Sequence, residues 1–159
     1  MIVIADSSAL VAVSTYQGLD WLEPLFGTVL VPTAVYNEVC TQGKPQASQL
    51  KAYLDGRVRT VNLSAFNLQK TTGLGAGELE AIALYKAENA QLFLIDDQKA
   101  KKSAFANGLE TLGSVGLLLL AKEEGLIHEI RSRLTLLEQS EIYLSSKLIE
   151  QILQAAGEL

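Results

Sequence analysis

The chain has 159 residues, 48% of them hydrophobic and 19% charged, so it can bury one sizeable core, and its length favours a single domain. Its formal net charge of −5 argues against the large uniform basic surface that drives nonspecific binding to nucleic acid. The single cysteine, Cys40, excludes an internal disulfide and favours a reducing, cytoplasmic compartment.

In the N-terminal half, short apolar runs typical of buried strands alternate with segments of helical period. The first run has no basic residues before it and meets polar residues after Ala5, so we expect a strand there and neither a signal peptide nor a membrane span. Pro32 and Thr33 suit the start of a later helix. The predicted elements, in chain order, are a strand over 2–5, a helix capped by Ser7 or Ser8 that continues to residue 13, a helix over 19–26, a strand over 28–31, a helix over 32–39, a helix over 46–54 and a strand over 58–61.

The C-terminal half opens on an irregular segment, residues 64–75. Residues 76–89 are apolar nearly all round, which is typical of a helix buried against a sheet. The elements that follow are a strand over 92–95, a helix over 98–107, a strand over 109–112, a helix over 113–121 and a helical tail from about residue 126. We expect residues 1–130 to form the main domain and residues 131–159 to form a helical extension that packs on the same domain or on a partner.

Strands that alternate with helices predict an α/β sandwich with a mainly parallel sheet, because parallel neighbours need crossover connections. Binding sites in such sheets form at the carboxyl ends of strands. Asp6 and the pair Asp96 and Asp97 each follow a predicted strand directly. Glu38 and Glu78 lie on predicted helices that can reach the same edge. We therefore expect these five carboxylates to converge.

Converging carboxylates predict a metal site. A carboxylate at the rim of a hydrophobic core is costly to desolvate alone, so several of them imply a compensating cation, and oxygen ligands favour Mg²⁺ or Mn²⁺. Each residue also has an ordinary structural alternative: a helix cap for Asp6 or Asp96, a first-turn helix position for Glu78 and an exposed helix face for Glu38. Their joint order along the chain favours the metal site.

Other polar residues are weaker candidates. Ser7 and Ser8 are candidates to hold a metal-bound water or a scissile phosphate, with helix capping as the alternative. The only dense basic run consists of Lys99, Lys101 and Lys102. This basic run is a candidate contact for a phosphate backbone, with a solvated helix face as the alternative. His128 is the only histidine and lies in the helical tail, so no Ser-His-Asp arrangement is evident.

Five segments follow one another along the chain: the first strand with Asp-Ser-Ser after it, then VYNEV, GLGAGELEAIAL, LIDDQKAKKSA and GLETLGSVGLLLLAKEEGLI. In this order they resemble the PIN-domain proteins. More narrowly, the chain is similar to a prokaryotic branch related to the toxin ribonucleases of type II toxin–antitoxin systems. The resemblance covers roughly residues 1–130.

This resemblance implies a three-layer α/β/α sandwich with a five-stranded parallel sheet, and an acidic site for Mg²⁺ or Mn²⁺. The implied activity is metal-dependent hydrolysis of phosphodiester bonds in single-stranded RNA. By match to the motifs, the acids of the site are Asp6, Glu38, Glu78 and either Asp96 or Asp97. The resemblance also implies a homodimer that is neutralised by a small antitoxin, whereas the expected cytoplasmic location and the absence of membrane contact rest on Cys40 and the N-terminal run.

The chain departs from the usual pattern of that branch at Gln98 and Lys101, where arginines are expected. Lysine offers phosphate a point charge without the bidentate fork of a guanidinium group, which weakens the expectation of substrate binding. A catalytically weak or inactive PIN-like nucleic-acid-binding module is therefore the main alternative. A Mg²⁺-dependent phosphoacceptor signalling domain is a remote one, because it would place an acid pair after the first strand and an acceptor after the third, and no acid follows VRTV here.

Overall fold

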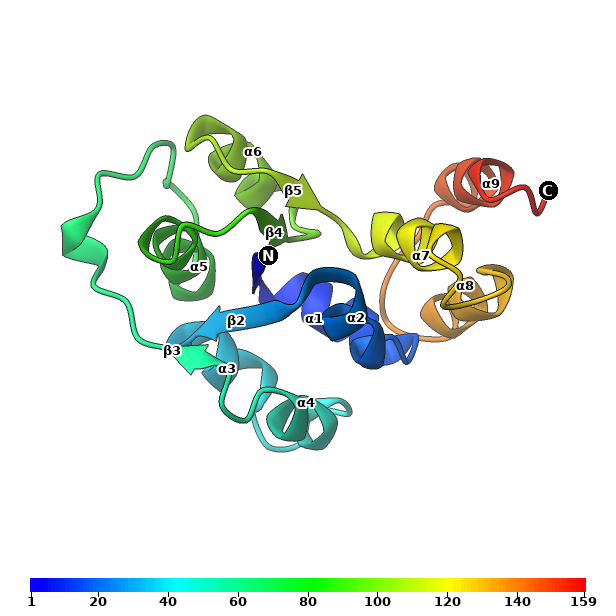
Figure 1. The fold of residues 1–159 in the computed structure, drawn as a ribbon, viewed down its shortest axis with the longest axis horizontal. Coiled ribbons are helices and arrows are strands. Elements are labelled where there is room, and N and C mark those ends of the chain that lie inside the picture. The colour runs from blue at the N-terminus through cyan, green and yellow to red at the C-terminus, as the bar shows by residue number, and fades with distance from the viewer.

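The computed structural model describes residues 1–159 and contains one five-stranded sheet, all parallel, in the order β3-β2-β1-β4-β5 (Figure 1). The strands are β1 (Ile2–Ala5), β2 (Thr28–Pro32), β3 (Val58–Arg59), β4 (Leu92–Leu94) and β5 (Thr111–Leu112). The predicted parallel sheet is confirmed. The strand predicted over 58–61 is too long, because its partner β2 ends at Pro32, which pairs with Arg59 and has no N–H to extend the ladder.

Helices connect the strands and enclose the sheet. They are α1 (Ser7–Thr15), a 3₁₀ turn η1 (Leu19–Trp21), α2 (Leu22–Phe26), α3 (Thr33–Val39), α4 (Ala47–Tyr53), a 3₁₀ turn η2 (Leu63–Ala65), α5 (Ala76–Ala87), α6 (Gln98–Ala106), α7 (Ser114–Glu123), α8 (Arg131–Glu138) and α9 (Ser146–Ala155). The single helix predicted over 19–26 is wrong. Pro24 has no N–H to bond the carbonyl of Asp20, so the α-helical pattern begins only at Leu22.

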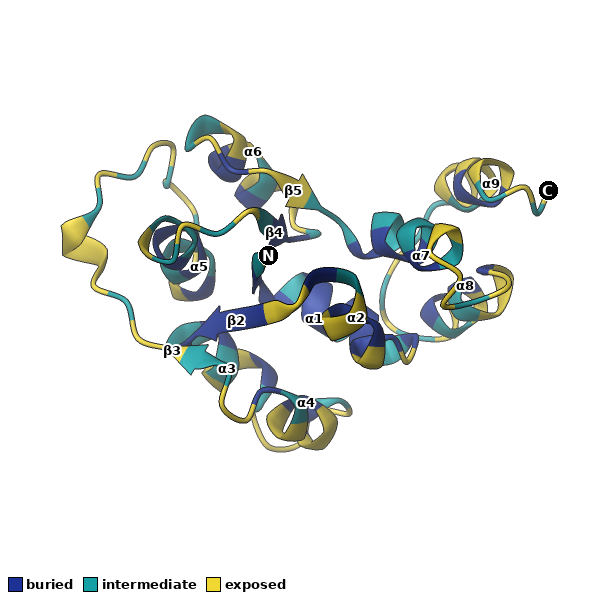
Figure 2. Cartoon of the chain, in the orientation of Figure 1, coloured by how far each residue is buried: buried dark blue, intermediate teal, exposed yellow.

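Side chains of the strands alternate between two buried cores, which gives the three layers. In β1, Ile4 faces a smaller core under α5 and α6, while Val3 and Ala5 face a larger core on the other side. The three central strands, β2, β1 and β4, are accordingly mostly buried, whereas the edge strands β3 and β5 are half-buried or exposed (Figure 2). Strands of this kind read as continuous apolar runs rather than as alternating ones, as those of the sequence do.

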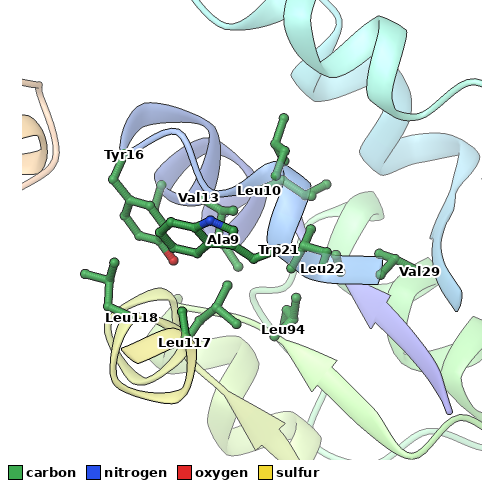
Figure 3. Packing of buried hydrophobic residues seen from close by; sticks show 14 of the residues in the cluster. Ala9, Leu10, Val13, Tyr16, Trp21, Leu22, Val29, Leu94, Leu117 and Leu118 are labelled. Atoms are coloured by element: carbon green, nitrogen blue, oxygen red, sulfur yellow. The ribbon is translucent and has the colours of Figure 1, made fainter. Parts of the chain in front are cut away.

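The larger core holds α7 against α1. The rings of Tyr16 and Trp21 stack with centroids 5.6 Å apart and face Leu117 and Leu118 of α7 (Figure 3). The hydroxyl of Tyr16 donates to the main-chain oxygen of Ser114, 2.8 Å away, at the first residue of α7. This contact satisfies a buried hydroxyl and fixes where α7 begins, next to the carboxyl edge of the sheet.

The C-terminal helices α8 and α9 lie beside α7, on the side of the molecule away from α5 and α6 (Figure 1). Leu134, Leu137, Ile152 and Leu153 belong to the same larger core as the residues of α1. The helical tail therefore contributes to the core of this chain. No helix has the length and apolar character needed to cross a membrane.

Glu158 holds the C-terminal end of the chain against α7 and the start of α8 through hydrogen bonds. Its carboxylate accepts from Lys122 Nζ at 2.9 Å and from the main-chain N–H groups of Ile130 at 2.8 Å and Arg131 at 3.2 Å. Burial raises the pKa of Glu158, but these hydrogen bonds outweigh it and place the pKa below its ordinary value. A lowered pKa adds stability above the ordinary pKa of glutamate, and that stability is lost as the pH falls through the folded value.

We therefore expect Glu158→Ala to lower the free energy of unfolding by about 1 to 3 kcal/mol at pH 7, because Ile130 is buried and its N–H would lose its partner. The difference from the unchanged protein should shrink towards pH 3. Urea unfolding at both pH values measures it. Glu150→Ala, exposed on α9, is the control; an equal loss in both variants would contradict the prediction.

Candidate acidic site

A cavity of about 390 Å³ opens at the carboxyl ends of β1 and β4. The two strands are neighbours, with Ala5 paired to Leu94, and the N–H of Asp6 donates to the carbonyl of Leu94 at 2.9 Å. This pairing places the residue after β1 beside those after β4. The polar residues lining the cavity are Asp6, Ser7, Ser8, Glu38, Glu78, Asp96 and Asp97. The structure therefore brings together all five carboxylates and both serines of the predicted site.

Asp6 is the most deeply placed of these carboxylates. Only 2% of its surface is exposed, and its Oδ1 is buried without a hydrogen-bond partner. It occupies the N-cap position of α1 but makes no side-chain capping bond, so the capping alternative does not account for its carboxylate. Burial raises the pKa of Asp6 to about 7, the N–H of Ser7 partly offsets this, and the charges of Glu78, Glu38 and Asp97 add to the rise.

Glu38 extends from α3 towards Asp6. The hydroxyl of Ser7 donates to Glu38 Oε2 at 2.7 Å, which fixes one side of this carboxylate. Gly77, in the first turn of α5, lies between the two acids: a Cβ at this position would be 3.1 Å from Glu38 Oε2 and 3.9 Å from Asp6 Oδ1. The absence of a side chain at Gly77 therefore gives the Glu38 carboxylate the space that it occupies.

We expect Gly77→Ala to weaken Mg²⁺ or Mn²⁺ binding by about tenfold, because the new methyl group would displace Glu38. The backbone at Gly77 is helical without a positive φ, so alanine should not destabilise α5 and favours its helical state. Titration calorimetry with each metal, beside a thermal melt, measures both effects. An unchanged affinity would show that Glu38 is not part of the metal site.

Glu78 lies in the first turn of α5, where a carboxylate is favoured by the helix dipole. Its side chain turns back over the start of the helix, since a Cβ at Gly75 would be 2.9 Å from Glu78 Oε2. Its charge nevertheless contributes to the raised pKa of Asp6. Glu78 therefore occupies the first-turn helix position of the structural alternative and also lines the acidic cavity.

The paired aspartates after β4 have different surroundings. Asp97 is the N-cap of α6 and its Oδ1 accepts from the N–H of Ala100 at 2.8 Å. Asp96 does not cap that helix; its two carboxylate oxygens accept from the N–H and the hydroxyl of Ser114, at 2.8 and 2.6 Å. The charge of Asp97 raises the pKa of Asp6, whereas Asp96 is held against the start of α7.

Ser114 and Lys44 were not singled out in the sequence. Ser114 is 4% exposed and directly follows Gly113 after β5, the neighbour of β4, so its place at the carboxyl edge was the available signal. Lys44 carried no such signal, because it lies in the irregular segment between α3 and α4. Its Nζ donates to the main-chain oxygen of Glu38 at 3.1 Å.

The basic run does not line the acidic cavity. Lys101 comes nearest: its Nζ and Asp96 Oδ1 lie 3.5 and 3.0 Å from the position of a Cβ at Gly113. Lys99 extends towards Gly73 in the segment before α5, and Lys102 is exposed. None of the three forms an ion pair. Of the basic run, only Lys101 therefore lies beside a carboxylate of the cavity.

The donor set suits a divalent cation. As the side chains stand, no three His, Cys, Asp or Glu residues are arranged closely enough to hold a metal ion. The charged groups lining the cavity are all carboxylates, and the most buried one, Asp6, has an oxygen without a partner. Hard oxygen ligands of this kind are those that Mg²⁺ and Mn²⁺ prefer. His128 is exposed and does not line the cavity.

Comparison of the sequence with known protein families finds a match. A family model described as a PIN domain matches residues 2–158. The match includes every strand, all the carboxylates of the cavity and the helices α8 and α9. No curated protein matches the chain.

Proposed function

The chain belongs to the PIN-domain family over residues 2–158, and from that premise we propose that it is a metal-dependent endoribonuclease that hydrolyses phosphodiester bonds of single-stranded RNA. The observation that carries the proposal is the buried, unpartnered carboxylate of Asp6 within a cavity lined by four further carboxylates. PIN domains are generally nucleases, and a PIN domain suggests a nucleic-acid substrate.

We assign the metal site to Asp6, Glu38, Glu78 and Asp97. These are Asp6 and the three carboxylates whose charges raise its pKa. A bound Mg²⁺ or Mn²⁺ supplies a water of lowered pKa and neutralises charge on the phosphate. The cation is also needed for substrate to approach, because five carboxylates repel a phosphodiester.

The remaining polar residues orient this site. Ser7 holds Glu38 by the hydrogen bond at 2.7 Å. Ser8 accepts the N–H of Asp96 at 3.1 Å, so its own hydroxyl hydrogen stays available to donate to a phosphate oxygen. Lys101, near Asp96, provides the positive charge at the rim. Asp96 acts as a positioning residue, because both its oxygens hold Ser114.

A PIN-like module that binds nucleic acid without cutting it is the second candidate. It is favoured by Gln98 and Lys101, which stand where arginines are expected from the family resemblance, and by the position of Lys99 and Lys102 outside the cavity. A substrate held by fewer phosphate contacts binds more weakly. Metal-dependent cutting decides between the two candidates.

The test is cleavage of end-labelled single-stranded RNA with Mg²⁺, Mn²⁺ or EDTA. We expect cutting with either metal and none in EDTA, and Glu78→Gln should cut about a hundredfold more slowly, because it removes a charge from the metal site with little change of shape. Glu123→Gln, exposed on α7, is the control. Bound metal without cutting would favour the second candidate, and cutting that Glu78→Gln leaves unchanged would mean that the site is wrongly assigned.

We further propose a cytoplasmic toxin or toxin-like component that forms a homodimer and is neutralised by a small antitoxin. The physical support for an association with another chain is the exposure of large apolar side chains, with Phe105 and Tyr143 each 85% exposed. Such side chains are common at protein interfaces. Light scattering of the purified chain gives the mass that distinguishes a dimer from a monomer.

A further inference from the structure

A second and larger cavity adjoins the acidic one. It has a volume of about 750 Å³ and lies between α1, α4 with the segment that precedes it, and the segment joining α8 to α9. Val11 and Ile142 line both cavities, so the two share a wall. We call it the side cavity. Part of it is formed by residues 139–142, in the segment joining α8 to α9.

The lining of the side cavity differs chemically from that of the acidic cavity. It contains one lysine, Lys44, and one glutamate, Glu141, so its formal charges cancel. Its other polar groups are hydroxyls and the three amides of Gln46, Gln49 and Gln139. An amide offers a donor and an acceptor side by side, which is the pattern that pairs with the edge of a nucleobase.

One of these amides is held in place. Ser14, which is 4% exposed, donates its hydroxyl to Gln49 Oε1 at 3.0 Å. The amide nitrogen of Gln49 makes no hydrogen bond within the protein, so its donors are available to a ligand. Fixing a donor before binding reduces the entropy that binding must overcome.

Lys44 places a positive charge in the lining of the side cavity. Its Nζ lies 3.1 Å from the main-chain oxygen of Glu38, whose carboxylate lines the acidic cavity. A nucleotide in the side cavity would therefore have an ammonium group within its binding site. A lysine in such a place contacts phosphate without regard to sequence.

We propose that the side cavity is a nucleoside subsite that holds the base beside the phosphate at the acidic cavity and selects it through the amides of Gln49 and Gln139. Its volume falls within the range of about 300 to 1,000 Å³ usual for small-ligand pockets. The inference rests on the proposed function in one respect, that the acidic cavity receives a phosphodiester.

The test is binding of fluorescein-labelled RNA octamers of A, C or U, measured by anisotropy in the protein with Asp6 unchanged, with Ca²⁺ in place of Mg²⁺ as a cation that also takes oxygen ligands. We expect one octamer to bind at least about fivefold more tightly than another, and Gln49→Ala or Gln139→Ala to reduce that ratio to below about twofold. Lys44→Ala should weaken all three octamers alike and make binding less dependent on salt.

Gln151→Ala, an exposed glutamine of α9 that does not line the side cavity, is the control and should change nothing. Gln49→Ala removes the hydrogen-bond partner of the buried Ser14, so this variant can lose stability for a reason unrelated to RNA. The side chain of Gln139 has no hydrogen-bond partner within the protein, so Gln139→Ala replaces the first variant if that one fails to fold. Equal binding of the octamers, or a preference that survives both glutamine changes, overturns the inference.

The outcomes separate the two proposals. Metal-dependent cutting by the unchanged chain together with equal binding of the octamers leaves the nuclease standing and removes the subsite. A base preference that depends on Gln49 or Gln139, without any metal-dependent cutting, supports the subsite and removes the nuclease activity.

Discussion

Replacing Asp6 by asparagine is expected to lower RNA cleavage by at least about a thousandfold and, in EDTA at pH 8, to make the protein more stable. The loss of activity follows from the position of Asp6 at the centre of the acidic cavity, where neighbouring charges act on it. The gain in stability follows from its burial, because an ionised carboxylate with an unpartnered oxygen is costly in the folded state. An asparagine amide has no charge and can donate to the carboxylates around it.

The pH dependence has a definite sign. The pKa of Asp6 is raised from 3.8 to about 7 on folding, so the side chain is protonated in both states below pH 3.8 and its full contribution to stability is present there. As the pH rises through 7 that contribution is lost, because the unfolded chain ionises first. The rise in the pKa of Asp6 from 3.8 to about 7 lowers the free energy of unfolding by roughly 4 kcal/mol at most by pH 8.

Urea unfolding at pH 4 and pH 8 in EDTA measures this difference. The gain from Asp6→Asn should be small at pH 4 and largest at pH 8, and Mg²⁺ should stabilise the unchanged protein more than the variant. Asp55→Asn, at an exposed position after α4, is the control. A variant that is less stable than the unchanged protein at pH 8 would mean that the Asp6 carboxylate has a stabilising partner in the folded state.

The elements at the carboxyl edge of the sheet were predictable because they depend on local signals. A buried apolar run that ends in an acid places that acid at the end of a strand, and parallel pairing then brings Asp6 and Asp97 to one edge. The helices carrying Glu38 and Glu78 were predictable from their periodicity, and α3 and α5 pack against each other beside that edge. Local pattern was therefore enough for the sheet and for the convergence of the acids.

Features that depend on the packing of distant segments were not predictable. Ser114 holds Asp96 only because β5 pairs with β4 and delivers the start of α7 there. The role of Gly77 depends on Glu38, 39 residues earlier in the chain, so no local pattern around the glycine reveals it. The spacing of the basic run does not reveal which of its lysines faces the site, because that depends on how α6 is rotated against the sheet.

Asp97→Asn is expected to lower cleavage by about a thousandfold with almost no change in stability, whereas Asp96→Asn should lower it by about tenfold or less. Asparagine caps a helix as well as aspartate does, so the bond to Ala100 survives while the charge beside Asp6 is removed. At Asp96, an asparagine can still accept the N–H of Ser114 and donate to its hydroxyl, so α7 keeps its position.

Both substitutions remove one charge and keep one structural contact, so a difference in cleavage between them reports the location of the metal site. Cleavage rates with saturating Mg²⁺, beside thermal melts, measure the two effects. Asp96→Ala tests the contact with Ser114 itself: it should lower the free energy of unfolding by about 1 to 3 kcal/mol, because it leaves two buried groups of Ser114 without an acceptor. If Asp96→Asn, well folded, is as inactive as Asp6→Asn, then Asp96 holds the metal and its bonds to Ser114 orient a ligand, because outer hydrogen bonds to a ligating carboxylate are usual in metal sites.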